Sequence, residues 1–197
     1  MLSTTPRHAR RGIFGVISSF VKWLRDARIS VYSTVLTICF TVIVFLFCFL
    51  FFRPTVVSGS SMNPTLFSKD LLLLNGVSQE LGYGDIAVIR LDNNTLLIKR
   101  VIGLAGDTIY INEEDGCVYR NGERLNEPYA VFPTPAQQLT AEVLVPLGHI
   151  FVLGDNRINS HDSRYNDIGM VPVDTVIGKA VYRLYPFKSA GKLSTEE

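Results

Sequence analysis

The chain has 197 residues, which is enough for one ordinary domain and a membrane anchor, and 47% of them are hydrophobic. Its formal net charge is +1, and no nucleic-acid partner is expected. The charge is unevenly distributed. Residues 1–53 hold seven of the nineteen basic residues and one of the eighteen acidic residues, a net +6, which leaves −5 for the rest of the chain.

The first 28 residues are a basic leader in which apolar side chains recur at helical spacing. An amphipathic helix of this composition lies in the interface of a membrane with its apolar face toward the lipid. Residues 1–28 are therefore predicted to form a cytoplasmic amphipathic leader on the inner leaflet. The apolar positions are Ile13, Phe14, Ile17, Phe20, Val21 and Leu24.

A membrane-length apolar segment follows at residues 29–53. No residue from 29 to 52 is charged, and a helix of this length reaches about 36 Å, enough to span a bilayer. Six of the seven basic residues in residues 1–53 precede the segment, so the N-terminus is predicted to lie in the cytoplasm and the rest of the chain outside it. A cleaved signal peptide is the alternative. Against it, the leader and the apolar core are too long and no small-x-small site follows.

Residues 54–188 are predicted to form an extracytoplasmic all-β domain of folded, barrel-like sheets. Asn121-Gly122 suits a type I′ hairpin turn within it. A small β-subdomain is expected to be inserted at about residues 112–147, and residues 189–197 are expected to be a disordered tail. Strands are predicted from Val, Ile and Tyr content and turn spacing at residues 86–91, 95–102, 108–111, 117–120, 149–153 and 176–185.

Three cysteines give no basis for a disulfide in the outer domain. Cys39 and Cys48 lie in the anchor, which leaves Cys117 alone. Cys117, His149 and His161 could be imagined as metal ligands, but their spacing matches no zinc pattern. No metal or cofactor is expected.

Ser61 is the first candidate for chemistry. It follows the anchor by a few residues, in a segment where Gly59 permits close backbone approach and Pro64 stiffens the chain. A serine is a poor nucleophile until a neighbouring base takes its proton. Alone, a serine in such surroundings is most often a turn serine whose hydroxyl bonds nearby backbone.

Lys99 is the candidate base. Strand alternation places Leu97, Lys99 and Val101 on one face and Ile98, Arg100 and Ile102 on the other. An ammonium among aliphatic neighbours loses solvation, which lowers its pKa and allows a neutral amine near pH 7. The alternative is an edge-strand lysine whose stem lies on apolar surface while its head reaches water.

A third cluster, residues 154–164, concentrates acids, arginines and hydroxyls directly after an apolar strand. Loops held at strand ends are common mounts for catalytic groups. The alternative is a solvated loop with internal Asp/Arg pairs.

Together these segments resemble the ordered boxes of bacterial type I signal peptidases. The resemblance covers about residues 57–178. It is carried by Ser61-Met62-Asn63-Pro64-Thr65, Gly84-Asp85-Ile86-Ala87-Val88, the stretch from Lys99-Arg100-Val101-Ile102-Gly103 to Asp107, Gly154-Asp155-Asn156-Arg157 with Ser160, Asp162, Ser163 and Arg164, and Gly169-Met170-Val171-Pro172.

The resemblance implies a membrane-anchored serine endopeptidase that removes signal peptides with a Ser/Lys dyad. Ser61 would attack the scissile carbonyl, neutral Lys99 would take its proton, and Ser160 would orient the lysine. Gly59 stands where one variant of the family has an oxyanion-stabilising serine, so the Ser61 N–H would be the principal donor, with a water or the Ser60 hydroxyl as a possible second. The residues expected to hold the loop against the strand are Arg100, Asp155, Arg157, Asp162 and Arg164.

The same resemblance implies small apolar pockets for the first and third residues before the cut, although these residues could also be ordinary core. The positions matched to the pockets are Val57, Met62, Leu66, Val88, Leu97 and Ile98. The implied partners are signal peptides of exported preproteins and the lipid bilayer, with action near the export translocon and a monomeric state. The implied location is the bacterial cytoplasmic (inner) membrane.

Three alternatives stay open. His161 could pair with Ser61, backed by Asp155 or Asp162, as in a Ser/His mechanism. The chain could be related to the Ser/Lys self-cleaving repressors, although those carry a soluble DNA-binding N-terminus where this chain has an anchor. Finally, it could be a non-catalytic, membrane-tethered β-scaffold.

Overall fold

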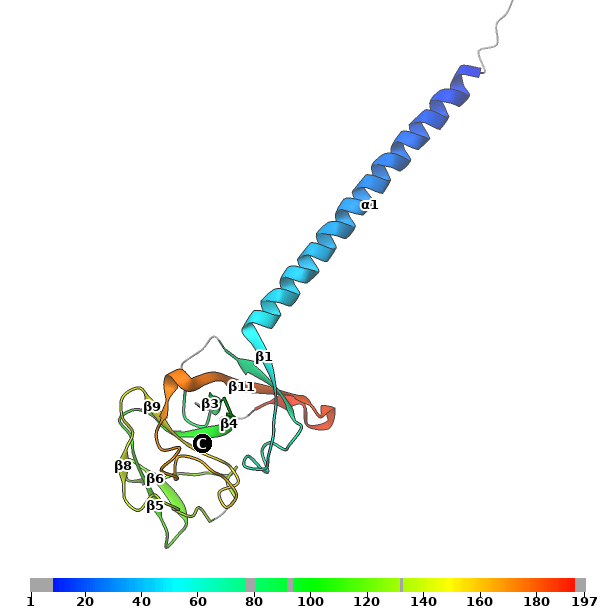
Figure 1. Cartoon of the computed structure of the whole chain (residues 1–197). Helices are drawn as coiled ribbons and strands as arrows, with labels where there is room; N and C mark the ends of the chain where they lie inside the picture. Colours follow the sequence, from blue (N-terminus) through cyan, green and yellow to red (C-terminus); the bar gives the residue numbers. More distant parts are fainter. Residues whose placement is uncertain (1–8, 77–80, 92–93, 132, 194–197) are drawn as a thin grey trace, which may run out of the picture. The chain divides into compact units, whose positions relative to one another are not determined.

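The computed structural model describes residues 9–76, 81–91, 94–131 and 133–193. The chain divides into two units, residues 1–50 and residues 51–197, and each is considered by itself. Within the described residues, the first unit holds residues 9–50 of the helix α1, whose bounds are Ala9–Phe51 (Figure 1). Its stretch Ile17–Leu46 is long and apolar enough to cross a membrane.

The helix differs in its bounds from the predicted leader and anchor. It runs without a break through residues 9–51, because no proline lies between Pro6 and Pro54 to interrupt it. A separate interfacial helix is therefore not seen, and residues 1–8 of the predicted leader lie outside the described residues. The predicted anchor also ends two residues too late. Phe52 and Arg53 already belong to a strand, since the residue before a proline favours extended backbone.

The second unit is built on antiparallel sheets, which confirms the predicted all-β domain. The larger sheet has eight strands in the order β1-β2-β11-β3-β4-β9-β10, with β12 paired to β11. Its strands are β1 (Phe52–Val56), β2 (Leu71–Asn75), β3 (Ile86–Arg90), β4 (Leu96–Gly103), β9 (His149–Leu153), β10 (Val171–Pro172), β11 (Val176–Tyr185) and β12 (Gly191–Lys192). Two short 3₁₀ helices, η1 (Val173–Thr175) and η2 (Phe187–Ser189), flank β11.

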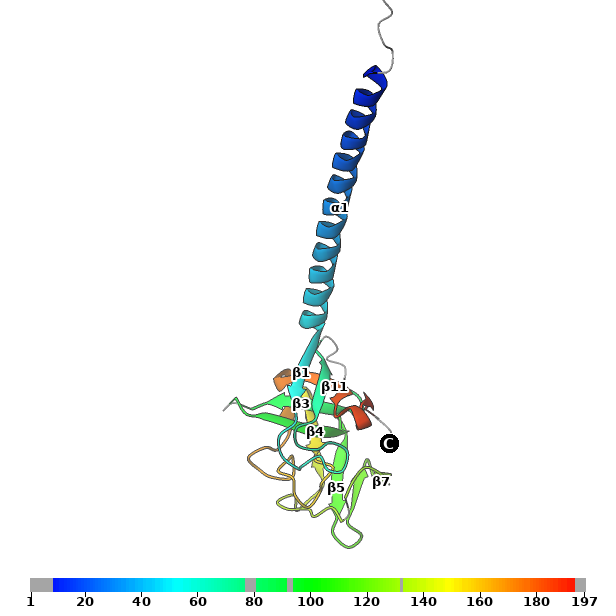
Figure 2. The ribbon, with the colours of Figure 1, turned by 90° about the vertical axis from the view of Figure 1, so that its right-hand side faces the viewer.

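A second sheet has four strands in the order β7-β6-β5-β8. They are β5 (Thr108–Asn112), β6 (Cys117–Arg120), β7 (Glu123–Arg124) and β8 (Val143–Leu144). Strands β6, β7 and β8 lie within residues 112–147, where the sequence analysis places an inserted subdomain, whereas β5 ends where that range begins. Asn121 and Gly122 both have positive φ, 55° and 79°, as the predicted type I′ turn between β6 and β7 requires. Within the second unit, Figures 1 and 2 both show this sheet at the opposite end from β1.

All six predicted strands are present with bounds shifted by at most one residue. The sequence analysis missed β1 and β2, whose leucine-rich and proline-containing segments show no clear alternation of apolar and polar residues. The predicted disordered tail is wrong for residues 189–193. Residues 191–192 pair with β11, and Leu193 packs into the core because its side chain is apolar. Residues 194–197 lie outside the described residues.

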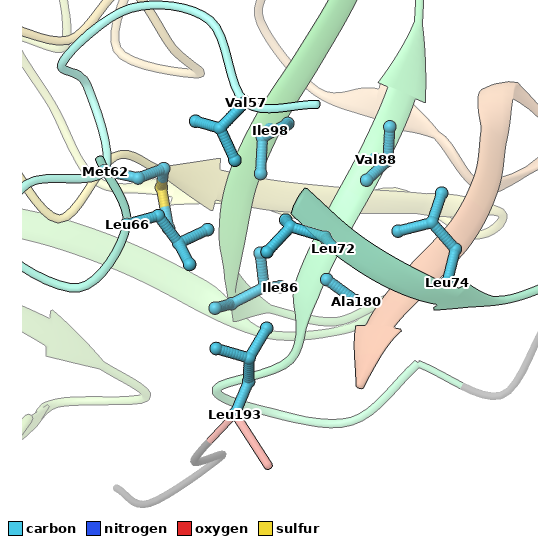
Figure 3. Packing of buried hydrophobic residues seen from close by; sticks show 10 residues of the cluster. All are labelled: Val57, Met62, Leu66, Leu72, Leu74, Ile86, Val88, Ile98, Ala180 and Leu193. Carbon is cyan, nitrogen blue, oxygen red and sulfur yellow. The ribbon is translucent and has the colours of Figure 1, made fainter. Parts of the chain in front are cut away.

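Three apolar clusters hold the domain together. One joins β2, β3 and β11 to the loop between β1 and β2 (Figure 3). A second joins β4 and β9 to the smaller sheet through residues such as Ile102, Ile109 and Phe151. A third covers the other face of β3, β4 and β9. Strand β4 is therefore surrounded by packed side chains and makes a rigid support for groups mounted on it.

Candidate active site

Lys99 lies in the interior of the larger sheet. Strand β4 is paired with β3 on one side and β9 on the other, and Lys99 is opposite Ala87 of β3. Its residue is only 3% exposed. The alternative of an edge-strand lysine with its head in water is therefore wrong, because β4 is a central strand and the side chain is enclosed.

Ser61 lies in the loop between β1 and β2, and its hydroxyl meets the Lys99 amine. Lys99 Nζ is 2.8 Å from Ser61 Oγ, which is hydrogen-bond distance. The loop is shaped by turns, with Asn63 N donating to Ser60 O and Leu66 N to Met62 O. Gly59 adopts a φ of +94°, a conformation that side chains rarely tolerate. The sequence-predicted nucleophile and base are thus brought together across 38 residues of chain.

Burial lowers the pKa of Lys99 from its usual 10.5 to about 8. Desolvation of the ammonium is the largest cause, because the charged form loses its water. The negative charge of Asp162 opposes the shift, Arg164 adds to it, and Asp155 opposes it more weakly. An appreciable fraction of the amine is therefore neutral near physiological pH and able to accept a proton.

The loop after β9, residues 154–164, is called here the β9 loop, and it is joined to the serine by main-chain contacts. Asn156 N donates to Ser61 O at 3.0 Å, and Asn156 Nδ2 donates to Ser60 O at 3.2 Å. A Cβ at position 154 would overlap both the main-chain oxygen of Ser61 and the hydroxyl of Ser160. Gly154 therefore allows the β9 loop to approach the serine closely.

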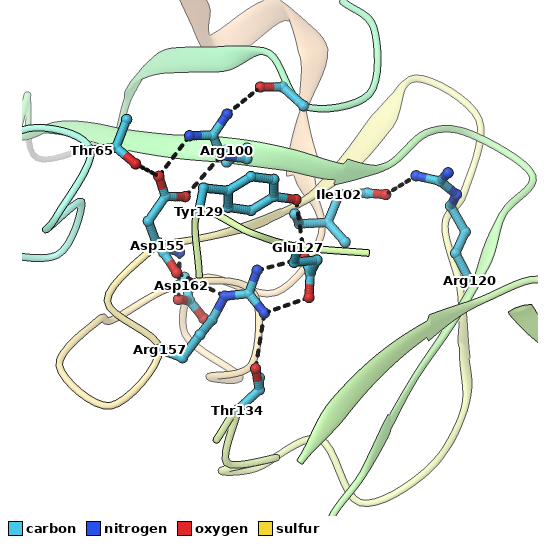
Figure 4. A network of polar contacts seen from close by, with 12 residues as sticks. Thr65, Arg100, Ile102, Arg120, Glu127, Tyr129, Thr134, Asp155, Arg157 and Asp162 are labelled. Atoms are coloured by element: carbon cyan, nitrogen blue, oxygen red, sulfur yellow. Dashed lines mark hydrogen bonds and ion pairs between the residues drawn. The ribbon is translucent and has the colours of Figure 1, made fainter. Parts of the chain in front are cut away.

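Asp155 ties the β9 loop to β4, as the resemblance implies. Arg100 makes a bidentate pair with it, from Nε to Oδ1 at 2.8 Å and from Nη2 to Oδ2 at 2.6 Å. Thr65, four residues after Ser61, donates its hydroxyl to the same carboxylate. One buried ion pair thus connects the strand of Lys99, the β9 loop and the serine loop (Figure 4).

Ser160 has a different partner from the one expected. Its hydroxyl donates to Asp162 Oδ2 at 2.6 Å, and the same oxygen accepts from Gly154 N at 3.0 Å. Arg164 holds that carboxylate from the other side, with its Nε 2.7 Å from Oδ1. The Ser160 proton is thus engaged by the carboxylate, and a direct hydrogen bond between Ser160 and Lys99 is not among the contacts of the described residues.

Arg157 also has an unexpected partner. The sequence analysis expects it to hold the β9 loop against β4, but it forms a bidentate pair with Glu127 of the inserted segment, at 2.9 and 2.6 Å. Sequence reasoning did not identify Glu127, which lies 30 residues away and outside every matched box. Glu127 lies in Asn126-Glu127-Pro128-Tyr129, a polar stretch with a proline, where apolar residues show no helical or strand periodicity.

The predicted pocket residues divide into two groups. Five of them, Val57, Met62, Leu66, Val88 and Ile98, belong to one buried cluster, and Figure 3 shows Val57 beside Ile98. Ile98 is the most exposed of these at 9%. Leu97 is not in this group. It packs against the third cluster, on the other face of β4, because neighbouring residues of a strand point in opposite directions.

The histidines and Cys117 have local partners of their own. His161 Nε2 is 2.8 Å from Asp167 Oδ2 and the ring lies against that of Tyr165 at a tilt of 34°, with more than half of the side chain exposed. His149 Nδ1 contacts Leu147 O, and Cys117 Sγ donates to Asp115 O. His161 therefore faces solvent and Asp167, an acid just beyond the β9 loop, which argues against the Ser61/His161 alternative. Within the described residues, no group of three or more potential ligands could hold a metal ion.

Gly59 limits which groups can stabilise an oxyanion at Ser61. Because position 59 carries no hydroxyl, the Ser61 N–H is the expected principal donor. The Ser60 hydroxyl, considered as a second donor, accepts from Asn159 Nδ2 at 2.9 Å. That contact leaves the Ser60 proton available to another acceptor.

A serine hydroxyl facing a buried, partly neutral lysine on a rigid β-sheet is typical of the serine peptidases that use lysine as their base. Comparison with known proteins narrows the class. Residues 29–185 match the family described as signal peptidase, peptidase S26. The chain is 38% identical over 152 residues to signal peptidase I of Bacillus caldolyticus, covering 70% of this chain and 81% of the relative. It is also 38% identical over 155 residues to the probable signal peptidase I-1 of Synechocystis, covering 73% and 76%.

The chain therefore belongs to the signal peptidase family, peptidase S26, as its sequence motifs predict. A solved structure of signal peptidase I from Enterococcus faecalis is 32% identical, covers 51% of this chain and 96% of that chain, and has a TM-score of 0.41. The family confirms the predicted enzyme class, a serine peptidase that removes signal peptides from preproteins. It gives no support to a self-cleaving repressor or a non-catalytic scaffold.

Proposed function

We propose that Ser61 and Lys99 are the catalytic dyad of this peptidase. The observation that carries the proposal is the 2.8 Å contact between Ser61 Oγ and the buried Lys99 Nζ. The neutral amine takes the Ser61 proton as Oγ bonds to the scissile carbonyl carbon. The resulting ammonium returns a proton to the amine of the leaving chain as the C–N bond breaks. Water then attacks the acyl-enzyme, with Lys99 again as the base, and frees Ser61.

The β9 loop has a supporting role in this proposal. Asp155, Asp162 and Arg164 fix the charges around Lys99, while Asn156 fixes the main chain of Ser61. Ser160 acts on the lysine through Asp162 instead of through a direct hydrogen bond. Preorganised groups of this kind lose no free energy to rearrangement during the reaction.

Substrate selection is proposed to use the buried cluster beside the serine loop. The cluster offers aliphatic surface from Val57, Met62 and Ile98, which suits small side chains of the substrate. The side chains of these three residues offer no hydrogen-bond partner to a larger, polar side chain of the substrate. An extended substrate could add its main chain to a strand edge and leave the side chains to discriminate. Leu66 and Val88 belong to the same cluster, whereas Leu97 packs against the third cluster, on the face of β4 that alternation also assigns to Lys99.

The proposed location is the bacterial inner membrane, with the N-terminus in the cytoplasm and the β-domain outside. The support is the stretch Ile17–Leu46, together with the net +6 of residues 1–53. In this arrangement the enzyme contacts lipid through α1 and acts where preproteins leave the export translocon, as a monomer.

Both parts of the proposal can be tested with a precursor that carries an Ala-x-Ala site. Wild-type enzyme in detergent should cut it, and Ser61→Ala should reduce cutting to the background, because the nucleophile is gone. In sealed inverted vesicles, which expose the cytoplasmic face, wild type should leave added precursor intact until detergent opens the vesicles. The measurement is the amount of mature product on a gel.

Ser68→Ala is the matched control for this experiment, because Ser68 is an exposed serine of the same loop. It should cut like wild type. Cutting by Ser61→Ala would reject the assigned nucleophile, and cutting by intact inverted vesicles would reject the assigned orientation.

The Lys99 pKa of about 8 predicts how the rate depends on pH. Only the neutral amine is a base, so kcat/KM should rise with pH up to about 8 and then level off. Below that it should fall about tenfold per unit, to roughly one hundredth of the plateau at pH 6. A pH–rate profile for a peptide substrate measures this directly. A rate that stays flat down to pH 5 would be incompatible with a lysine base.

A further inference from the structure

The inserted segment reaches the β9 loop through a short stretch, residues 127–135, called here the insert latch. Glu127 pairs with Arg157, whose Nη1 also donates to Thr134 Oγ1 at 2.9 Å. At the main chain, Val131 N donates to Asp155 O at 2.8 Å. Arg164 Nη1 donates to Pro135 O at 2.9 Å. Four contacts thus join a segment of no assigned role to the loop beside the catalytic pair, and Figure 4 shows the two that Arg157 makes with Glu127 and Thr134.

The Glu127–Arg157 pair is fully enclosed. Glu127 is 5% exposed and Arg157 0%. Two buried charges gain little net stability over apolar residues of the same size, since each loses its hydration. The same pair does fix geometry, because a bidentate guanidinium–carboxylate contact allows only one relative orientation. Its position therefore suggests a role in orientation more than in stability.

Hydrogen bonds of Arg157 connect its pair with Glu127 to the groups around Lys99. Its Nε donates to Gly154 O at 3.0 Å, and its main-chain oxygen accepts from Arg164 Nη1 at 2.8 Å. Arg164 in turn holds Asp162, which accepts from Gly154 N. The contacts form a closed circuit from Arg157 to Asp162, and Asp162 is the carboxylate with the largest charge effect on Lys99.

Tyr129 links this circuit to the second ion pair. Its hydroxyl donates to Glu127 Oε1 at 3.2 Å, and the guanidinium carbon of Arg100 lies 3.9 Å from the centre of its ring. Figure 4 shows the ring between Arg100 and Glu127. The insert latch is thereby linked to both carboxylates that act on Lys99. The link to Asp162 runs through Arg157 and Arg164, and the link to Asp155 runs through Tyr129 and Arg100.

We propose that Glu127 is a positioning residue for the catalytic pair, acting through Arg157 and the β9 loop. The inference rests on the proposed function of Ser61 and Lys99. It assigns the inserted segment a part in catalysis, although Glu127 contacts neither Ser61 nor Lys99 among the described residues.

Removing the charge of Glu127 should disturb the field at Lys99. In Glu127→Gln the buried Arg157 loses its counter-charge, and the other carboxylate whose charge acts on Arg157 is Asp155. Competition for Asp155 weakens its pair with Arg100 and displaces the β9 loop. The charged groups that act on Lys99 are Asp155, Asp162 and Arg164. Less negative charge near Lys99 lowers its pKa further.

The test uses the full chain in detergent with a peptide substrate and compares Glu127→Gln with Glu123→Gln. Glu123 is an exposed acid on β7 of the same inserted segment, so it controls for charge and location. Glu127→Gln should lower kcat about 10- to 100-fold with little change in KM, as displacement of a catalytic group does. The acid limb of its pH–rate profile should move to lower pH. Glu123→Gln should match wild type in all three.

A second set of variants separates positioning from folding. If Glu127 acts through Arg157, then Glu127→Gln should add little to the loss already caused by Arg157→Met. Thr134→Val and Tyr129→Phe each remove one hydroxyl without leaving a buried charge, and each should lower kcat several-fold. If Glu127→Gln does not fold, the kcat values of Thr134→Val and Tyr129→Phe test the proposal in its place.

Two results would overturn the proposal. One is a Glu127→Gln enzyme that melts at lower temperature but keeps the wild-type kcat and pH profile. The other is full additivity with Arg157→Met. Failure of the underlying dyad would be recognised separately, because wild type would then not cut the substrate or Ser61→Ala would still cut it.

Discussion

Lys99→Ala is expected to lower kcat/KM for preprotein cleavage by at least about 10³-fold. Among the described residues, Lys99 Nζ is the group within hydrogen-bond distance of Ser61 Oγ, so its loss leaves the hydroxyl without a base. A neighbouring group is poorly placed to replace it, because a guanidinium offers hydrogen-bond donors and no acceptor, and the carboxylates already accept strong hydrogen bonds. Initial rates of cleavage in detergent, with matched protein concentrations, measure the effect.

Lys99→Arg separates base catalysis from simple positive charge. Arginine keeps a cation and hydrogen-bond donors at the site but cannot be neutral at working pH. It should therefore be as inactive as Lys99→Ala. An active Lys99→Arg enzyme would show that the lysine acts as a fixed charge instead of a base.

His161→Ala tests the rival mechanism in the same assay. His161 is engaged with Asp167 and Tyr165 at the surface, so its removal should leave the rate within about twofold of wild type. The opposite pattern, with His161→Ala inactive and Lys99→Ala active, would exchange the two assignments.

The strands and the dyad were accessible from sequence for different reasons. Alternation and turn residues predicted the core strands because those signals are local, as Asn121-Gly122 shows. The pairing of Ser61 with Lys99 came from the order of the family's boxes, since no local pattern relates residues so far apart in the chain. Alternation on β4 also separated Leu97 from Ile98, and the structure places them in different clusters.

The partners of Arg157 and Ser160 were not accessible from sequence, although the resemblance did imply that Asp155 holds the β9 loop against the strand of Arg100. Arg157 and Ser160 lie among several acids and hydroxyls of the β9 loop, and composition does not say which of them each will contact. The partners of Arg157 and Ser160 depend on how the inserted sheet packs against β9. This packing brings Glu127 to Arg157, and Ser160 then donates to Asp162. These contacts are set by tertiary packing between distant segments, so a motif match can name the residues without giving the network.

Asp155→Ala is expected to lower the free energy of unfolding by about 3–5 kcal/mol. Asp155 is fully buried and accepts two hydrogen bonds from Arg100, itself 1% exposed. Removing the carboxylate leaves a buried guanidinium without its counter-charge, and also removes the acceptor of the Thr65 hydroxyl. Both losses fall in the interior, where water cannot easily replace the missing partner. Urea unfolding of the full chain in detergent, followed by circular dichroism, gives the change.

Asp167→Ala is the control that isolates burial, because Asp167 also pairs with a basic side chain but at the surface, with His161. Exposed pairs contribute little, since water and salt screen them. Its urea midpoint should therefore stay close to that of wild type while that of Asp155→Ala falls. Equal midpoints for the two variants would mean that the Arg100–Asp155 pair is readily solvated. In that case the β9 loop would be held to β4 mainly by its main-chain hydrogen bonds and by the insert latch.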